Sequence, residues 1–244
     1  MSGALAMLMP ERMPACPGGN EFGIVFAGRH ADNRPFLFLE FHNTTGVGGY
    51  PERDGEDAGP WCLTNVANVP VEVIEAENPI RVEEYALLPD TGGPGRHRGG
   101  LGIVRQYRLL ADEATVQLRS DRQRHAPWGL ARGLPGARSR SLLNPGPGET
   151  VLPSKFLLTM RKGDVFRAEM PGSGGHGPAS ERDPEAVADD VRSGKVSVQH
   201  ARSAYGIVMD AAGLAVDAAA TRRLRAEQIE ALHDAEAQLR RQSQ

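Results

Sequence analysis

The glycine-rich stretch Pro89-Asp-Thr-Gly-Gly-Pro-Gly-Arg-His-Arg-Gly-Gly-Leu-Gly102 is followed at residues 103–110 by Ile-Val-Arg-Gln-Tyr-Arg-Leu-Leu, which has the character of a β-strand. In a dinucleotide-binding fold, a glycine-rich loop runs instead from a strand directly into a helix. The order of elements around residues 89–102 therefore argues against a doubly wound nucleotide fold. We expect most of these glycines to form tight backbone turns rather than a ligand site.

Two further glycine-rich loops lie at residues 44–55 and 171–178 and carry Arg, Asp or His among the glycines. Segments rich in aromatic and branched apolar residues separate the loops and predict short strands. These strands are expected at residues 21–27, 35–41, 80–88, 101–109, 114–118, 155–160 and 164–170. The first two flank a polar turn and predict a β-hairpin, and Gly163-Asp164 predicts a tight turn between the last two.

Residues 181–244 contain only four of the glycines and prolines of the chain, and here the pattern changes to helices. The two predicted helices, each with its N-cap and its terminating glycine, are residues 185–193 between Asp183 and Gly194 and residues 198–205 between Ser197 and Gly206. A third segment, residues 218–241, predicts a helix that packs on the body or on a partner.

These patterns predict an α+β fold with two parts. Residues 1–180 are expected to form a mainly antiparallel, glycine-loop-rich β body, and residues 181–244 a helical C-terminal segment.

The charge and composition of the chain exclude several classes of protein. A net charge of −3 and a pI near 6.2 give no general basic field, so we expect no nucleic-acid partner. The mean hydropathy is −0.39, and the apolar runs are too short to span a membrane. With only Cys16 and Cys62, neither a disulfide framework nor a cysteine-rich zinc site can form. We expect a soluble, cytoplasmic protein.

The chain lacks the common catalytic motifs. The P-loop pattern G-x-x-x-x-G-K-[ST] does not occur. The seven histidines lack the spacing of helical metal ligands, so we expect no complete metal site in this chain. Ser173 lies in Pro-Gly-Ser-Gly-Gly rather than in the G-x-S-x-G elbow of a hydrolase. Residue types alone therefore name no reaction and no catalytic residue.

Two glycine-rich loops supply the candidates for a substrate-binding or anion-binding site. These candidates are Asp90, Arg96, His97, Arg98, Gly174, Gly175 and His176. An arginine can clamp a carboxylate or phosphoryl group with two parallel hydrogen bonds, and Asp90 can orient it. The structural alternative is an Asp turn with solvated arginines and a His176 ring packed against glycine backbone.

Several blocks along the chain resemble one protein family in their order and spacing. They include Asn65-Val-Ala-Asn-Val-Pro-Val-Glu-Val-Ile-Glu75, the block at residues 85–102, and Pro171-Gly-Ser-Gly-Gly-His-Gly177. The chain resembles the C-terminal half of the hydantoinase B/oxoprolinase family, which includes the B-type subunit of N-methylhydantoinase, part of 5-oxoprolinase, and relatives in acetone and acetophenone carboxylases. The resemblance covers about residues 5–206, and Thr91 and His176 stand where the family usually has Ser and an aromatic residue.

The resemblance implies ATP-dependent hydrolysis of a cyclic amide of the hydantoin or 5-oxoproline type, together with a hydantoinase A type ATPase subunit. ATP and Mg are then expected on that partner, and this chain alone holds no cofactor. The family's N-terminal half carries blocks that look like ligands of a divalent metal. Those blocks have no counterpart here, so no metal is assigned to a residue, and a separate N-terminal hydantoinase B piece is a second candidate partner.

Two other interpretations stay open. In the first, the chain is a non-catalytic structural or assembly domain of such a complex. In the second, it is a subunit piece of a related ATP-dependent ketone carboxylase. A free-standing, β-rich ligand-binding module is a third and weaker interpretation.

Overall fold

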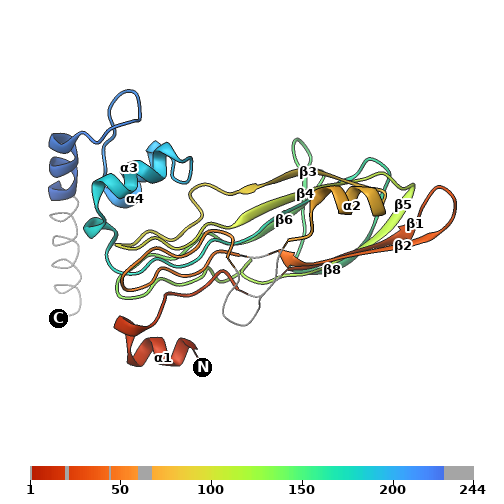
Figure 1. Cartoon of the computed structure of the whole chain (residues 1–244), viewed down its shortest axis with the longest axis horizontal. Helices are drawn as coiled ribbons and strands as arrows, with labels where there is room; N and C mark the ends of the chain where they lie inside the picture. The colour runs from red at the N-terminus through yellow and green to blue at the C-terminus, as the bar shows by residue number, and fades with distance from the viewer. Residues whose placement is uncertain (1, 20–21, 44, 60–67, 228–244) are drawn as a thin grey trace.

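The computed structural model describes residues 2–19, 22–43, 45–59 and 68–227 (Figure 1). Two antiparallel sheets pack face to face, extended glycine-rich chains continue from one end of them, and helices lie beyond these chains. The architecture is the predicted α+β fold, a mainly antiparallel, glycine-loop-rich β body followed by a helical C-terminal segment. The boundary at residue 180 between the β body and the helical segment remains a prediction.

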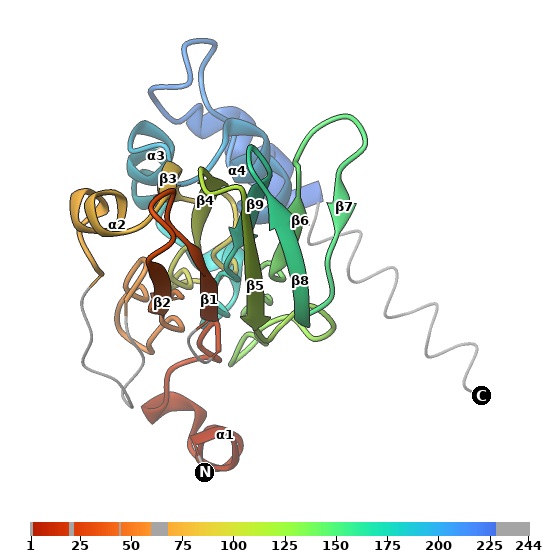
Figure 2. The ribbon, with the colours of Figure 1, turned by 90° about the vertical axis from the view of Figure 1, so that its right-hand side faces the viewer.

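The first sheet has four strands in the order β2-β1-β5-β8, and all neighbours are antiparallel (Figure 2). The strands are β1 (Phe22–Arg29), β2 (Pro35–Asn43), β5 (Glu113–Arg119) and β8 (Lys155–Arg161). The pairing of β1 with β2 confirms the predicted hairpin. Phe22, Ile24 and Phe26 are fully buried, because alternate residues of a strand face the same side of the sheet.

The second sheet has five strands in the order β3-β4-β9-β6-β7. They are β3 (Ile80–Leu87), β4 (Ile103–Leu109), β6 (Arg140–Leu143), β7 (Thr150–Val151) and β9 (Val165–Glu169). Gly163, with φ of 91°, forms the predicted turn after β8, but the chain crosses there from the first sheet to the second. The sequence pattern does not predict β6, β7 or helix α2 (Val71–Glu77), which are all short.

The main hydrophobic core lies between the two sheets. Phe26 on β1 lies with its ring centroid 5.6 Å from that of Tyr107 on β4 and 6.4 Å from that of Phe166 on β9. All three side chains are fully buried. Aromatic pairs in such tilted and edge-on arrangements add roughly 0.5–1.5 kcal/mol each beyond their buried area. The packed core between the two sheets therefore fixes the positions from which the glycine-rich chains leave the end of the sheets.

Five glycine-rich segments, residues 14–19, 46–57, 89–102, 127–137 and 171–177, lie side by side as extended chains that we call the glycine bundle (Figure 1). Their backbone hydrogen bonds run between segments in different directions. Ala15 N donates to Gly49 O at 2.8 Å, Gly49 N to Gly174 O at 2.9 Å, and Gly174 N to Cys16 O at 2.8 Å. These three bonds join three segments in a closed triangle, whereas the strands of an open sheet lie in a row, so the bundle is not a further sheet.

The glycines of the bundle allow backbones to approach closely. A Cβ on Gly99 would lie 2.1 Å from Ser173 O, and a Cβ on Gly174 would lie 2.0 Å from Trp128 O. None of the glycines in residues 89–102 lies in a hydrogen-bonded turn, and none has φ in the left-handed region. The prediction that most of them form tight turns is therefore wrong. Side chains are absent from these positions because neighbouring chains occupy the space.

The helical segment begins beyond the bundle with α3 (Pro184–Arg192) and α4 (Val198–Tyr205). Asp183 and Ser197 accept hydrogen bonds at 3.0 Å from the first-turn amides of Glu185 and His200, which confirms both N-caps. The predicted glycine stops are also confirmed, with φ of 69° at Gly194 and 64° at Gly206.

The helical segment has a small core of its own, built from buried residues that include Val187, Ala188, Ala201, Tyr205 and Ile207. The predicted helix over residues 218–241 is observed from 218 to 227, and the rest lies outside the described residues. Near the other terminus, α1 (Ser2–Leu8) lies beside the glycine bundle (Figures 1 and 2). The 3-10 turns η1 (Pro10–Arg12) and η2 (Ala179–Glu181) complete the described elements.

Candidate functional site

The glycine bundle brings the two predicted loops together. His97 and His176 form an antiparallel bridge in which each backbone N–H donates to the other residue's carbonyl at 2.9 Å. The N–H groups of Gly174 and Gly175 also donate to carbonyls of neighbouring segments, at 2.8 and 2.9 Å. These two amides are thus used within the bundle and are not available to hold an anion.

His176 is packed inside the bundle, as the structural alternative predicts. Its side chain is almost wholly enclosed, and a Cβ on Gly95 would lie 2.6 Å from the His176 backbone nitrogen. His176 Nε2 lies 3.0 Å from the carbonyl oxygen of Pro10, to which it donates. The ring therefore helps to fix the start of the chain against the bundle.

A largely buried network of charges joins the bundle to the helical segment. Three cations and three carboxylates form this charge network: Arg98, Arg182, Lys195, Asp54, Asp57 and Asp190. Arg98, which is only 2% exposed, donates from Nη1 to Asp57 at 2.9 Å and from Nε to Asp190 at 3.3 Å. The idea of a solvated Arg98 is therefore wrong, and its guanidinium clamps carboxylates of the protein itself.

Arg182, which the sequence reasoning missed, is the second centre of the charge network. Its two Nη atoms donate to both carboxylate oxygens of Asp54 at 2.6 and 2.7 Å, and Nη2 also donates to Asp190 at 2.8 Å. Burial alone raises the pKa of Asp54, but the hydrogen bonds from Arg182 outweigh it and lower that pKa below its usual value. Asp54 is therefore charged at neutral pH.

A pocket of about 330 Å³ lies beside this network and contains two of the predicted residues, Arg96 and His97. Its charged lining also includes Arg182 and the carboxylates of Asp54, Glu181 and Asp183. Burial lowers the pKa of His97, so the ring is neutral at pH 7. Three carboxylates against two guanidinium groups make this pocket a poor site for an anion.

Asp90 lies at the base of the helical segment rather than with the other predicted residues. Its Oδ1 accepts from Ser197 N at 2.7 Å, and its N donates to Lys195 O at 3.0 Å. Asp90 has φ of 63°, a left-handed conformation that Asp tolerates better than most residues. The contacts of Asp90 thus position the start of α4.

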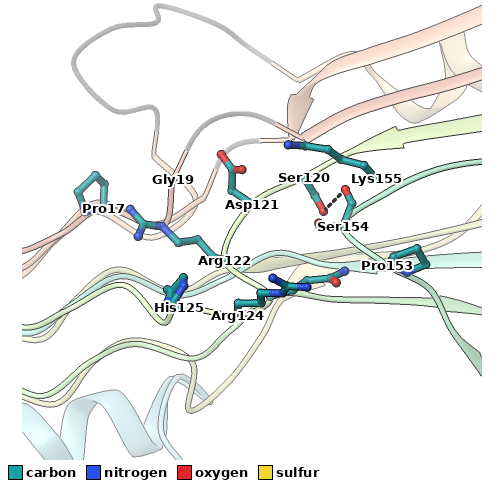
Figure 3. A pocket seen from close by; sticks show the side chains of 11 residues that line it. Pro17, Gly19, Ser120, Asp121, Arg122, Arg124, His125, Pro153, Ser154 and Lys155 are labelled. Atoms are coloured by element: carbon teal, nitrogen blue, oxygen red, sulfur yellow. Dashed lines mark hydrogen bonds between the residues drawn. The ribbon is translucent and has the colours of Figure 1, made fainter.

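A second pocket, of about 610 Å³, lies where β5 ends and β8 begins, beside the glycine bundle (Figure 3). Its polar lining includes Ser120, Asp121, Arg122, Arg124, His125 and Lys155. We call it the basic pocket. The sequence reasoning missed it, although the run Ser120-Asp-Arg-Gln-Arg-His125 gathers basic residues directly after a predicted strand.

Within the described ranges, no three His, Cys, Asp or Glu side chains come together in a way that could hold a metal ion. A complete set of three donors for the divalent metal that the family resemblance implies is therefore not formed within these ranges. None of the helices in the described ranges combines the length and apolar character needed to cross a bilayer.

Fold and site together define a class of α+β proteins in which glycine-rich loops form a structural bundle instead of a nucleotide-binding loop. The profile of the hydantoinase B/oxoprolinase family matches residues 1–179. The chain belongs to the hydantoinase B/oxoprolinase family.

Curated relatives agree with this membership. The chain is 32% identical over 209 residues to the B-type subunit of a putative D-/L-hydantoinase from Pseudomonas sp. (strain NS671), covering 84% of this chain and 35% of the relative. It is 31% identical over 242 residues to the beta subunit of caprolactamase from Pseudomonas jessenii, covering 91% of this chain and 40% of the relative. The chain thus spans only 35 to 40% of these two relatives' lengths.

Solved structures show the same fold. The ATP-dependent caprolactamase from Pseudomonas jessenii matches with a TM-score of 0.77 and 29% identity, over 91% of this chain and 40% of that chain. Nucleotide-free acetone carboxylase also matches with a TM-score of 0.77, at 21% identity, over 89% of this chain and 34% of that chain. The second likeness shows the fold alone.

Proposed function

We propose that this chain forms the glycine-bundle part of a hydantoinase B type subunit that acts in ATP-dependent hydrolysis of a cyclic amide. The observation that carries the proposal is the family match over residues 1–179, which includes the whole glycine bundle. The similarity to an ATP-dependent caprolactamase supports the same reaction class. The ring amide would be of the hydantoin or 5-oxoproline type.

The proposed complex includes a hydantoinase A type subunit that holds ATP and Mg. This assignment is supported by the missing P-loop motif in the present sequence and by relatives whose names mark them as the B-type or beta component of an enzyme with several subunits. Phosphorylation of the amide oxygen on that partner would make the ring carbon electrophilic enough for attack by water. We place the complex in the reducing cytoplasm, in keeping with two cysteines and no disulfide framework.

The remainder of the family's subunit is the second proposed partner, as a separate N-terminal hydantoinase B piece or as further chain. Support comes from the outer face of the four-stranded sheet, where Leu37 and Leu157 are 68% and 70% exposed. Leu39, Val25, Gln117 and Leu157 follow one another across the four strands without a charge. An exposed sheet face is normally polar, so this face is suited to contact with another polypeptide.

An assembly role without catalysis is the second candidate function. It is favoured by the hydrogen bonds of Arg98, Gly174 and Gly175, which all serve contacts within the protein. The ketone carboxylase alternative has only the fold likeness to acetone carboxylase in its favour.

Co-expression with the two partners tests the proposal. We expect the chain to co-purify with them and the complex to open hydantoin or 5-oxoproline only when ATP is present. Arg96→Gln and His97→Asn variants separate the two roles. A loss of turnover in an intact complex indicates a substrate-contacting role, whereas unchanged turnover indicates assembly.

A further inference from the structure

We propose that the basic pocket binds a small organic oxyanion, either a carboxylate or a phosphate group. Arg122, Arg124 and Lys155 line it, and among the described residues of its lining Asp121 alone carries a carboxylate (Figure 3). His125 adds a further nitrogen donor. This lining has the opposite charge balance to the pocket that holds Arg96 and His97.

The described part of the chain does not neutralise the three cations of the basic pocket. Among the residues that the structure describes, neither arginine nor Lys155 forms an ion pair. By contrast, Arg98 and Arg182 are clamped by aspartates. Guanidinium and ammonium groups form their strongest hydrogen bonds with carboxylate and phosphate oxygens. The pocket therefore presents donors that an anionic ligand can satisfy.

Arg122 is held in an unusual conformation at the wall of the pocket. Its φ of 66° lies in the left-handed region, which arginine adopts rarely. Its Nη2 donates to Cys16 Sγ at 3.1 Å, and its carbonyl accepts from Ser139 N at 3.3 Å. Burial raises the pKa of the Cys16 thiol, so the sulfur is uncharged and does not compensate the positive charge of Arg122.

The walls of the pocket are built on paired strands. Arg119 at the end of β5 faces Lys155 at the start of β8, and Ser120 donates from both N and Oγ to Ser154 O, at 2.8 and 3.0 Å. These contacts fix the points at which the two basic segments leave the sheet. A volume of about 610 Å³ is within the range of small-molecule sites, so a ligand larger than an inorganic ion fits.

The inference does not depend on the proposed function, because binding is expected of this chain alone, without a partner or ATP. Isothermal titration of the full chain with inorganic phosphate and, separately, with acetate tests it. The ionic strength is held constant with chloride, because a screened surface charge would mimic weak binding. Tighter binding of phosphate points to a phosphoryl ligand, and tighter binding of acetate points to a carboxylate.

Three variants make the test specific. Arg124→Gln removes an exposed cation of the pocket and is expected to weaken binding roughly ten-fold, as for one charge-assisted hydrogen bond. Asp121→Asn removes the carboxylate and is expected to tighten binding. Arg81→Gln, at an exposed arginine on β3 outside the pocket, is the matched control and should leave binding unchanged.

The inference is overturned if neither anion shows saturable binding at constant ionic strength. It is also overturned if Arg81→Gln weakens binding as much as Arg124→Gln, or if Asp121→Asn fails to strengthen it. Thermal unfolding of each variant confirms that a change in affinity does not come from loss of the fold.

Discussion

Arg182 and Asp54 are joined by two hydrogen bonds of 2.6 and 2.7 Å across 128 residues of sequence. The pair ties the helical segment to the glycine bundle, and Asp190 on α3 accepts a third hydrogen bond from the same guanidinium. Through this contact the C-terminal helical segment helps to form the pocket that holds Arg96 and His97, although the family profile ends at residue 179.

The stability of the chain is expected to fall at acidic pH because of the charge network. Hydrogen bonds from arginines outweigh burial and lower the pKa values of Asp54 and Asp57. Their contribution is therefore complete above the usual aspartate pKa of about 4 and is lost as the pH falls through the lowered values. Urea unfolding between pH 7 and pH 3 measures this loss. Asp54→Asn should be less stable at pH 7 and lose less on acidification, and equal pH slopes would contradict the assignment.

Arg98→Gln is expected to destabilise the fold by about 1.5–3 kcal/mol, because Asp57 and Asp190 each lose one of their two cationic partners and keep only Lys195 and Arg182. Arg34→Gln breaks the exposed pair with Asp32 and serves as the control, with little expected change. Chemical denaturation of both variants checks the difference. Equal stabilities would show that the charge network does not hold the segments together.

Gly99→Ala is expected to destabilise the chain by at least about 3 kcal/mol or to prevent folding, because its Cβ would meet the carbonyl oxygen of Ser173 at 2.1 Å. Gly3→Ala is the matched control. Its Cβ would lie 3.8 Å from Trp128, and alanine favours the helix α1 by up to about 1 kcal/mol. Circular dichroism melting curves distinguish the two, and a Gly99→Ala protein as stable as wild type would refute close packing as the reason for the glycine.

Leu157→Asp is expected to leave the isolated chain folded and to abolish its association with the remainder of the subunit. The side chain lies on the outer face of the first sheet and is 70% exposed, so the charge costs little in the free chain but is unfavourable in an apolar contact. Leu214→Asp, at a 60% exposed leucine in the helical segment, is the control. Pull-down with the co-expressed remainder measures both, and equal recovery would exclude this face as the contact.

The sequence predicts local structure well where a short-range physical rule applies. The hairpin of β1 and β2 follows from two runs of aromatic and branched apolar residues on either side of a polar turn, and the helix caps at Asp183 and Ser197 follow from their oxygen side chains. The short strands β6 and β7 escape prediction because four and two residues carry too little pattern.

The structural role of the glycines, which is to let backbones of different segments approach closely, could not be predicted from the sequence of any single loop. Gly99 is required by a carbonyl 74 residues further along the chain, and a long-range approach of this kind leaves no local pattern. The same limit applies to the site. Arg96 and His97 do line a pocket, but Arg182 joins it through tertiary contacts alone. The basic pocket likewise combines residues around 122 with Lys155, which only the pairing of β5 with β8 brings together.

The most direct test of the proposed function is ATP-dependent ring opening by the reconstituted complex. Liquid chromatography with mass detection would follow conversion of 5-oxoproline to glutamate, or of hydantoin to its N-carbamoyl amino acid, with and without this chain and with and without ATP. We predict product only when the chain, both partners and ATP are all present. Equal product in the absence of this chain, or no product from the complete and correctly assembled complex with either substrate, would contradict the proposed function.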